Sequence, residues 1–306
     1  MSTELVITPT DPIISHPDTV VLDASWLYEP DPPTRDAYKE FQDGPRLPGA
    51  RFWSLDDISE PHPERYALML PSPERFARFA GNHGVSEGSH VVIYDSEGIF
   101  SAPRTAWTFK VYGHEKVSVI DGGLPRAKAE GVRLETGPPR EFKKTTYPVP
   151  TVDARAVVGE FGFVGVFADP PEYAEIAKIA ARKAPLDDKT VLIDARPAAS
   201  YESGHIPTSL LFDFPTALLK DPAGFTHLRD PDELKKHFVE RVGQETADKV
   251  FSRETTVVNT CGGGLSAAIN WLQLQSLGIS SRLYDEAWGG YSARPETVRI
   301  TGPNPV

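Results

Sequence analysis

Short apolar runs that end in a polar residue recur along the chain, and segments with helical spacing separate them. In the first half these runs are VVLD, HVVIYD and VSVID, which start at Val20, His90 and Val117. Their counterparts in the second half are VLID, TTVVNT and SRLYD, which start at Val191, Thr255 and Ser281. Strands that are apolar on both faces are typical of parallel sheets covered by helices. The pattern therefore predicts an α/β fold, with mostly parallel sheets flanked by helices.

Helix starts with proline at the first helical position occur at matching places in the two halves. Ser72 is a candidate N-cap before Pro73, and Asp230 takes the same place before Pro231. A short polar side chain at the N-cap accepts hydrogen bonds from the first turn, and proline suits a position whose N–H has no helical partner. We expect each half to carry a helix that starts at its proline.

Corresponding residues of the two halves keep a nearly constant separation. Asp95 and Cys261, which follow matching strands, lie 166 residues apart, and Asp121 and Asp285 lie 164 residues apart. An offset that holds across the chain indicates a tandem duplication of one α/β domain.

The segment between the two halves has a different composition. It reads TGPPREFKKTTYPVPTV, with four prolines and no apolar periodicity. Such a segment is typical of an extended linker. We therefore predict a first domain at residues 1–135, a linker at 136–152 and a second domain at 153–306.

Composition and charge narrow the functional classes. The chain carries 43 acidic and 32 basic residues, which gives a formal net charge of −11. An acidic surface repels phosphate backbones and anionic lipids, so neither nucleic acid nor membrane is an expected partner. The single cysteine excludes an intramolecular disulfide and cysteine-rich metal sites, and it suits a reducing compartment. The N-terminal segment lacks the features of a secretory signal or a clear transit peptide, so we expect a cytoplasmic protein, with mitochondria as the alternative.

The lone cysteine, Cys261, stands where a strand gives way to a glycine-rich loop and a helix. The residues that follow it are Gly262, Gly263, Gly264, Leu265 and Ser266. Consecutive glycines let backbone N–H groups face inward, and a helix N-terminus adds a positive dipole end. Both features favour the thiolate, which is the nucleophilic form. The alternative is a buried structural cysteine, which does not require three glycines after it. We therefore predict that Cys261 is a nucleophile.

The residues near Cys261 discriminate between thiolate chemistries. A phosphatase requires an arginine six residues after the cysteine, where this chain has Ala267. The chain also lacks the glycine-rich patterns of nucleotide-binding loops. A cysteine hydrolase requires a histidine base, and the sequence does not show which of its eight histidines approaches the thiol. What remains is the transfer of one sulfur atom from a small anionic donor to Cys261, with loop amides stabilising the persulfide. This chemistry implies no metal and no organic cofactor.

Motifs along nearly the whole chain resemble those of the two-domain rhodanese family, which includes thiosulfate sulfurtransferase and mercaptopyruvate sulfurtransferase. In chain order they are VLDASW, LPGARFW, SAPRTAW, VSVIDGGL, VLIDARP, SGHIP, TCGGGLSAA, YDEAW and SARPE. The resemblance implies two tandem rhodanese-like domains and a ping-pong reaction. Cys261 takes the sulfane sulfur of the donor, holds it as a persulfide and passes it to a thiophilic acceptor. The first domain, with Asp95 at the position of the nucleophile, is expected to be catalytically silent.

The identity of the donor stays open between mercaptopyruvate and thiosulfate. Rhodaneses that use thiosulfate carry two basic residues directly after the cysteine, where this chain has Gly262 and Gly263. The mercaptopyruvate enzymes resemble this chain in their Cys-Gly start, but they carry Ser or Thr at the position of Gly263 and His at that of Leu68. Their second carboxylate-binding arginine lies in a longer insert, which is shortened here to PAASYES without arginine.

Three charged residues are predicted to serve the donor. Arg196 matches the family's substrate-binding arginine and could hold a carboxylate or sulfonate by two parallel bonds, the alternative being a salt bridge to Asp194 or Glu202. Asp56 matches an acidic residue that points toward the site in mercaptopyruvate enzymes, with a helix N-cap or a solvated acid as the alternative. Arg294 is expected either to reach the site or to cap the C-terminal segment. Ser266 is expected to donate to the persulfide, to cap the following helix, or both.

The sequence thus predicts a sulfurtransferase with a small anionic donor and a thiol, cyanide or protein acceptor. Two alternatives stay open. One is a rhodanese-like binding or regulatory protein without turnover, which the departures at Gly263 and Leu68 favour. The other is a carrier that relays sulfur to another protein in a biosynthetic pathway.

Overall fold

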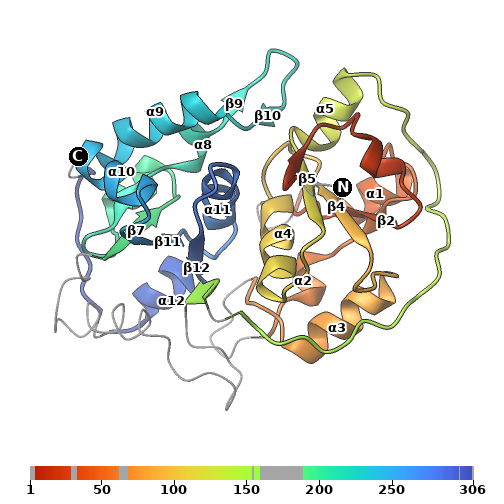
Figure 1. Ribbon diagram of the computed structural model, residues 1–306, viewed down its shortest axis with the longest axis horizontal. Coiled ribbons are helices and arrows are strands. Elements are labelled where there is room, and N and C mark those ends of the chain that lie inside the picture. The colour runs from red at the N-terminus through yellow and green to blue at the C-terminus, as the bar shows by residue number, and fades with distance from the viewer. Residues whose placement is uncertain are drawn as a thin grey trace. The chain divides into compact units, whose positions relative to one another are not determined.

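The protein folds into two compact α/β units, seen here in a computed structural model (Figure 1). The structure describes residues 4–28, 33–61, 68–153, 155–158, 189–295 and 297–304. Unit 1 comprises Met1–Ser59, Pro71–Val152 and Lys220–Leu228. Unit 2 comprises Glu60–Leu70, Asp153–Leu219 and Arg229–Val306. The segment 136–152, expected to be a linker, therefore clusters with the first unit.

Each half of the chain contributes one short segment to the unit formed mainly by the other half. We call Glu60–Leu70 the first-half arm, which belongs to unit 2, and Lys220–Leu228 the second-half arm, which belongs to unit 1. The sequence analysis did not anticipate this exchange, because the composition of neither segment distinguishes it from an ordinary loop.

Unit 1 is built on a five-stranded sheet in the order β1-β5-β4-β2-β3, and all of its neighbouring strands pair in parallel. Its strands are β1 (Val6–Ile7), β2 (Thr19–Asp23), β3 (Arg51–Phe52), β4 (His90–Tyr94) and β5 (Val117–Ile120). The helical elements are η1 (Pro12–Ser15), α1 (Ala37–Asp43), α2 (Leu55–Ile58), α3 (Pro73–Asn82), α4 (Ala102–Val111) and α5 (Gly123–Ala129). In Figure 1, α4 packs beside β4 and β5.

Unit 2 repeats this sheet in the order β6-β12-β11-β7-β8, again parallel throughout. The strands of this sheet are β6 (Val157–Val158), β7 (Thr190–Asp194), β8 (Leu210–Leu211), β11 (Thr256–Thr260) and β12 (Ser281–Tyr284). Its helices are α7 (Ala198–Ser203), α8 (Phe214–Ala217), α9 (Pro231–Val242), α10 (Gln244–Phe251), α11 (Ser266–Ser276) and α12 (Ala287–Ala293). The strands β9 (Leu219–Lys220) and β10 (Thr226–His227) form a separate two-stranded sheet within the connection that carries the second-half arm.

The predicted parallel α/β architecture is confirmed, and so are the two proline-started helices. The Ser72 side chain accepts from the N–H of Arg75 at the start of α3, and Asp230 accepts from two N–H groups at the start of α9. Each sheet is buried between its helices because its strands are apolar on both faces. In unit 2, for example, Ile193 and Val257 from adjacent strands are fully buried in one apolar cluster with residues of α9 and α10.

Candidate active site

Cys261 lies at the carboxyl end of the central strand β11, directly before the loop that leads into α11. The residue is 1 % exposed, and the N–H of Gly264 donates to its sulfur at 3.0 Å. Gly264 has a φ of +85°, a conformation that favours glycine. This loop therefore turns a backbone donor onto the thiol, as the run of glycines predicted. The predicted residues Gly262, Gly263, Gly264 and Leu265 lie in this one turn, and Ser266 begins α11.

The start of α12 fixes the backbone of the sulfur loop. The N–H of Trp288 donates to the carbonyl of Cys261 at 2.8 Å, and the N–H of Gly289 donates to the carbonyl of Gly262 at 3.0 Å. The preceding residue, Ala287, adopts a φ of +54°, which costs free energy for a residue with a side chain. Sequence reasoning did not assign these residues to the site, although the YDEAW motif held the signal, because it matches the VIDGGL segment of the first half.

Among the residues that the structure describes, the space beside the first two glycines of the sulfur loop is empty. A side-chain carbon built on Gly262 or Gly263 would meet no atom of these residues within 4 Å. The described part of the chain therefore leaves space beside the loop for a small donor. It also shows that neither glycine is required by close packing at its Cβ position.

The corresponding loop of unit 1 shows what this turn can bind. The carboxylate of Asp95 accepts four backbone N–H groups, each at 2.9 Å, which belong to Glu97, Phe100, Ser101 and Ala102. Burial raises the pKa of this carboxyl, and the four hydrogen bonds oppose the rise. Because helix N-termini and inward-facing amides bind anions, the turn is a complete anion cradle that its own side chain fills. The sulfur of Cys261 stands at the matching place in unit 2.

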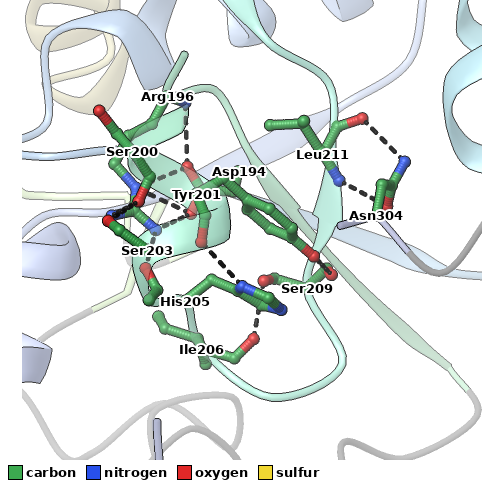
Figure 2. A network of polar contacts seen from close by, with 11 residues as sticks. Asp194, Arg196, Ser200, Tyr201, Ser203, His205, Ile206, Ser209, Leu211 and Asn304 are labelled. Carbon is green, nitrogen blue, oxygen red and sulfur yellow. Dashed lines mark hydrogen bonds and ion pairs between the residues drawn. The ribbon is translucent and has the colours of Figure 1, made fainter. Parts of the chain in front are cut away.

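Arg196 lies at the end of β7, the strand that pairs with β11, and its guanidinium is enclosed by neighbouring groups (Figure 2). Its Nη2 contacts the Asp194 carboxylate at 2.7 Å and the Gly204 carbonyl at 2.9 Å, and its Nε lies 3.0 Å from the same carboxylate. Its Nη1 donates to the Ser200 carbonyl at 3.3 Å. The guanidinium also lies 4.6 Å from the ring centroid of Trp288. The structure thus shows the salt bridge that the sequence analysis gave as the alternative, and the substrate-binding role stays a prediction.

His205, which lies near Arg196 in Figure 2, makes contacts suited to a structural residue. Its Nδ1 lies 2.9 Å from the carbonyl of Tyr201, and its ring stacks on the Tyr201 ring with centroids 3.7 Å apart. Burial lowers the pKa of this imidazole, so the neutral form is favoured. The residue therefore stabilises the turn after α7.

The other predicted side chains occupy separate places. Arg294 follows α12 and forms an ion pair with the buried Glu286 at 2.6 Å, so it stabilises the helix whose start holds the sulfur loop. Asp56 belongs to unit 1, lies in α2 and accepts from the Trp26 indole at 3.0 Å. It is not an N-cap, because Ser54 caps that helix.

Ser266 was expected to cap the helix α11, to donate to the persulfide, or both, and the structure tests only the first of these roles. This residue is the first residue of α11, and Leu265 occupies the N-cap position without a side-chain cap bond. The capping role expected for Ser266 is therefore wrong, since a cap must precede the helix. Its donation to a persulfide stays a prediction. Across the described ranges, no three His, Cys, Asp or Glu residues gather as a metal site, and no helix is long and apolar enough to span a bilayer.

Comparison with known proteins identifies the class. The sequence profile of the rhodanese-like domain matches residues 17–130 and 179–294, so the chain belongs to the rhodanese family. The probable 3-mercaptopyruvate sulfurtransferase of Schizosaccharomyces pombe is 32 % identical to it over 289 residues, which cover 93 % of this chain and 91 % of the relative. The human 3-mercaptopyruvate sulfurtransferase is 31 % identical over 291 residues, covering 92 % and 88 %. The crystal structure of the Escherichia coli 3-mercaptopyruvate sulfotransferase SseA matches with a TM-score of 0.71 at 28 % identity and covers 90 % of this chain and 94 % of that chain.

Proposed function

We propose that the protein is a sulfurtransferase that carries sulfur as a persulfide on Cys261. The observation that carries this proposal is the N–H of Gly264 directed at the only thiol of the chain, within a turn whose repeat in unit 1 binds a carboxylate. Backbone donors directed at a sulfur stabilise negative charge on it, both in the thiolate and on the outer sulfur of a persulfide. The relatives named as sulfurtransferases over nearly the full chain support the same activity.

The reaction takes place in two steps. The Cys261 thiolate attacks the transferable sulfur of the donor, a new S–S bond forms, and the bond between that sulfur and the rest of the donor breaks with its electron pair leaving on the donor. Thiosulfate leaves as sulfite, whereas 3-mercaptopyruvate leaves as the enolate of pyruvate, which then takes up a proton. A thiolate or cyanide acceptor then attacks the outer sulfur, and Cys261 leaves as the thiolate. Neither step requires an oxidant or a metal. The silent unit cannot take part, because the Asp95 carboxylate has no sulfur to exchange.

We assign 3-mercaptopyruvate as the preferred donor. The relatives described above carry that name, and the loop offers Gly262 and Gly263 where thiosulfate enzymes place basic residues. Arg196 is proposed to bind the donor's carboxylate through Nη1, because that nitrogen carries two hydrogens and the 3.3 Å contact to Ser200 uses one. The acceptor is a small thiol, cyanide or a protein thiol. The single cysteine suits the reducing cytoplasm.

Intact-mass measurement tests the activity directly. After incubation with 3-mercaptopyruvate and removal of the donor, the protein should gain the mass of one sulfur atom, and addition of cyanide should remove it with release of thiocyanate. Cys261→Ser should show neither change. Parallel incubation with thiosulfate ranks the two donors. A protein that gains no sulfur from either donor, or a Ser variant that gains as much as wild type, would overturn the proposal.

A further inference from the structure

Two carboxylates at matching strand ends each bind the arm contributed by the other half of the chain. In unit 2, the N–H of Leu70 in the first-half arm donates to Asp285 at 2.8 Å. In unit 1, the N–H of Leu228 in the second-half arm donates to Asp121 at 2.8 Å. Leu70 and Leu228 stand two residues before the matching N-caps of α3 and α9. The same contact therefore occurs in both repeats.

In unit 1 the bound arm lies directly on the silent loop. The side-chain hydroxyl of Thr226 accepts from the N–H of Ile99 at 3.1 Å and lies 3.3 Å from the carbonyl of Glu97. A side-chain carbon on Gly98 would come within 2.7 Å of the Thr226 carbonyl oxygen and 2.9 Å of its nitrogen. The Asp121 carboxylate thus holds the arm in place over the turn that contains Asp95.

Because the two halves are repeats, the residues of this arrangement in unit 1 have counterparts in unit 2, which contains Cys261. The residue two positions before Leu70, and so the counterpart of Thr226, is Leu68, and the counterpart of Gly98 is Gly264. Leu68 is only 5 % exposed, and it adopts a φ of +59°. A leucine is held in that conformation only where its surroundings determine it. Gly264 is the residue whose N–H donates to the Cys261 sulfur.

We propose that Asp285 is a positioning residue that holds residues 68–70, the end of the first-half arm, over the sulfur loop, with Leu68 covering Gly264 and the thiol. The Asp285 carboxylate is buried, so its hydrogen bond to Leu70 is formed away from bulk water. Three residues later the N–H of Trp288 fixes the carbonyl of Cys261. One strand end therefore orients both the sulfur loop and its cover. The kinetic part of this inference rests on the proposed function, whereas the accessibility of the thiol does not.

Alkylation of the single thiol tests the inference in the intact protein. Asp285→Ala should raise the rate of Cys261 alkylation by iodoacetamide about tenfold or more, because the loss of the hydrogen bond from Leu70 lets Leu68 move away from the thiol. The same variant should raise the KM for 3-mercaptopyruvate more than it lowers kcat, since the persulfide-forming loop is intact. Asp285→Asn keeps an acceptor oxygen and should restore most of both values.

Asp121→Ala is the matched control. It removes the equivalent 2.8 Å bond in the silent unit, together with the 2.6 Å ion pair to Arg126, so it should also lower the melting temperature. Its alkylation rate and donor KM should equal those of wild type. Equal alkylation rates for Asp285→Ala and wild type, or an equal acceleration in Asp121→Ala, would overturn the inference.

A second variant covers the case in which Asp285→Ala fails to fold. Leu68→Gly suits the φ of +59° and removes the covering side chain, so it should fold and accelerate alkylation about tenfold. An unchanged rate would reject the cover. Because alkylation requires no donor, it remains informative if neither donor transfers sulfur, an outcome that would reject the proposed function instead.

Discussion

The carbonyl groups of Asp95 and Cys261 are held in the same way in the two repeats. Asp95 accepts from the N–H of Leu124 at 2.9 Å, and Cys261 accepts from the N–H of Trp288 at 2.8 Å. Beyond the backbone, the Asp95 carboxylate fills its turn with four hydrogen bonds, whereas the Cys261 sulfur accepts from Gly264. Duplication thus produced two copies of one anion-binding turn. One copy contains the Asp95 carboxyl group, and the other contains a thiol that can exchange sulfur.

Replacement of Asp95 should separate stability from activity. Asp95→Ala leaves four N–H donors without their carboxylate, two of them buried, so we expect a loss of about 3 kcal/mol in the free energy of unfolding. Acetate should recover part of this loss by binding in the vacated turn. Sulfur transfer at temperatures where the variant is folded should stay near the wild-type rate. Urea unfolding with and without acetate measures the effect on stability, and thiocyanate release measures the effect on activity. A variant with wild-type stability and no activity would contradict the assignment of unit 1 as catalytically silent.

Substitution of Arg196 should affect both the fold and donor binding. Arg196→Lys keeps one charge but cannot reproduce the planar contacts to Asp194, Gly204 and the Trp288 ring. We expect a stability loss of about 1–3 kcal/mol and a fall in kcat/KM for 3-mercaptopyruvate of about ten- to a hundredfold.

Arg294→Lys is the control for this substitution, since it alters another arginine–carboxylate pair, the one with Glu286, and should lower stability with a smaller change in kcat/KM. Donor kinetics and melting temperature are measured on both variants. Wild-type kinetics in Arg196→Lys, accompanied by a lower melting temperature, would reduce Arg196 to a structural ion pair.

The stability of unit 1 should depend on pH through Asp23. Burial raises the pKa of this carboxyl from its ordinary value of 3.8 to about 6, against the opposing hydrogen bonds from Ser25. The folded protein therefore binds the proton more tightly than the unfolded chain, and this group lowers stability as the pH rises from about 4 to above 6. The difference between the two pKa values corresponds to about 3 kcal/mol.

Asp23→Asn removes this titration. The free energy of unfolding of the variant, minus that of wild type, should therefore increase by about 2 kcal/mol between pH 4 and pH 7. Urea unfolding at several pH values measures the difference. A difference that stays constant over this range would show that Asp23 has the same pKa in the folded and unfolded states.

Alanine at Gly98 should loosen the second-half arm. The new carbon would overlap the backbone of Thr226 at 2.7–2.9 Å, and the φ of +110° is unfavourable for alanine. We expect a loss of at least about 2 kcal/mol, from overlap and backbone strain together. Gly49→Ala controls for strain alone, because Gly49 also has a positive φ of +70° but no atom of the described residues within 4 Å of the new carbon. Equal melting temperatures for the two variants would contradict the close contact.

The elements of the fold could be predicted from the sequence, because each depends on a local pattern. Apolar runs specified the central strands, and the N-caps Ser72 and Asp230 specified two helix starts, as the structure confirms. The sulfur loop was predictable for a similar reason, since three glycines after Cys261 restrict the conformation little and leave its N–H groups available. In contrast, the partner of Arg196 depends on the orientation of its side chain. The local sequence is therefore compatible both with binding of the donor and with a salt bridge to a neighbouring acid.

The role proposed for Asp285 has no local signature. Its partner is the backbone N–H of Leu70, 215 residues earlier in the chain, and any residue except proline offers that donor. The 164-residue offset between Asp121 and Asp285 held part of the signal, because it indicated two equivalent strand ends. Only the three-dimensional structure shows that each strand end binds an arm of the other half.

The exchange of arms has a consequence for the cooperativity of unfolding. The first-half arm is joined at both ends to unit 1, and the second-half arm is joined at both ends to unit 2. We therefore expect the unfolding of either unit to pull its arm from the other unit. That step would break the hydrogen bond to Asp285 or to Asp121, so partial unfolding costs free energy in both units. A chain that reads as two repeats should therefore melt in a single transition. Fragments cut at the linker would each lack a segment and should regain full stability only when mixed.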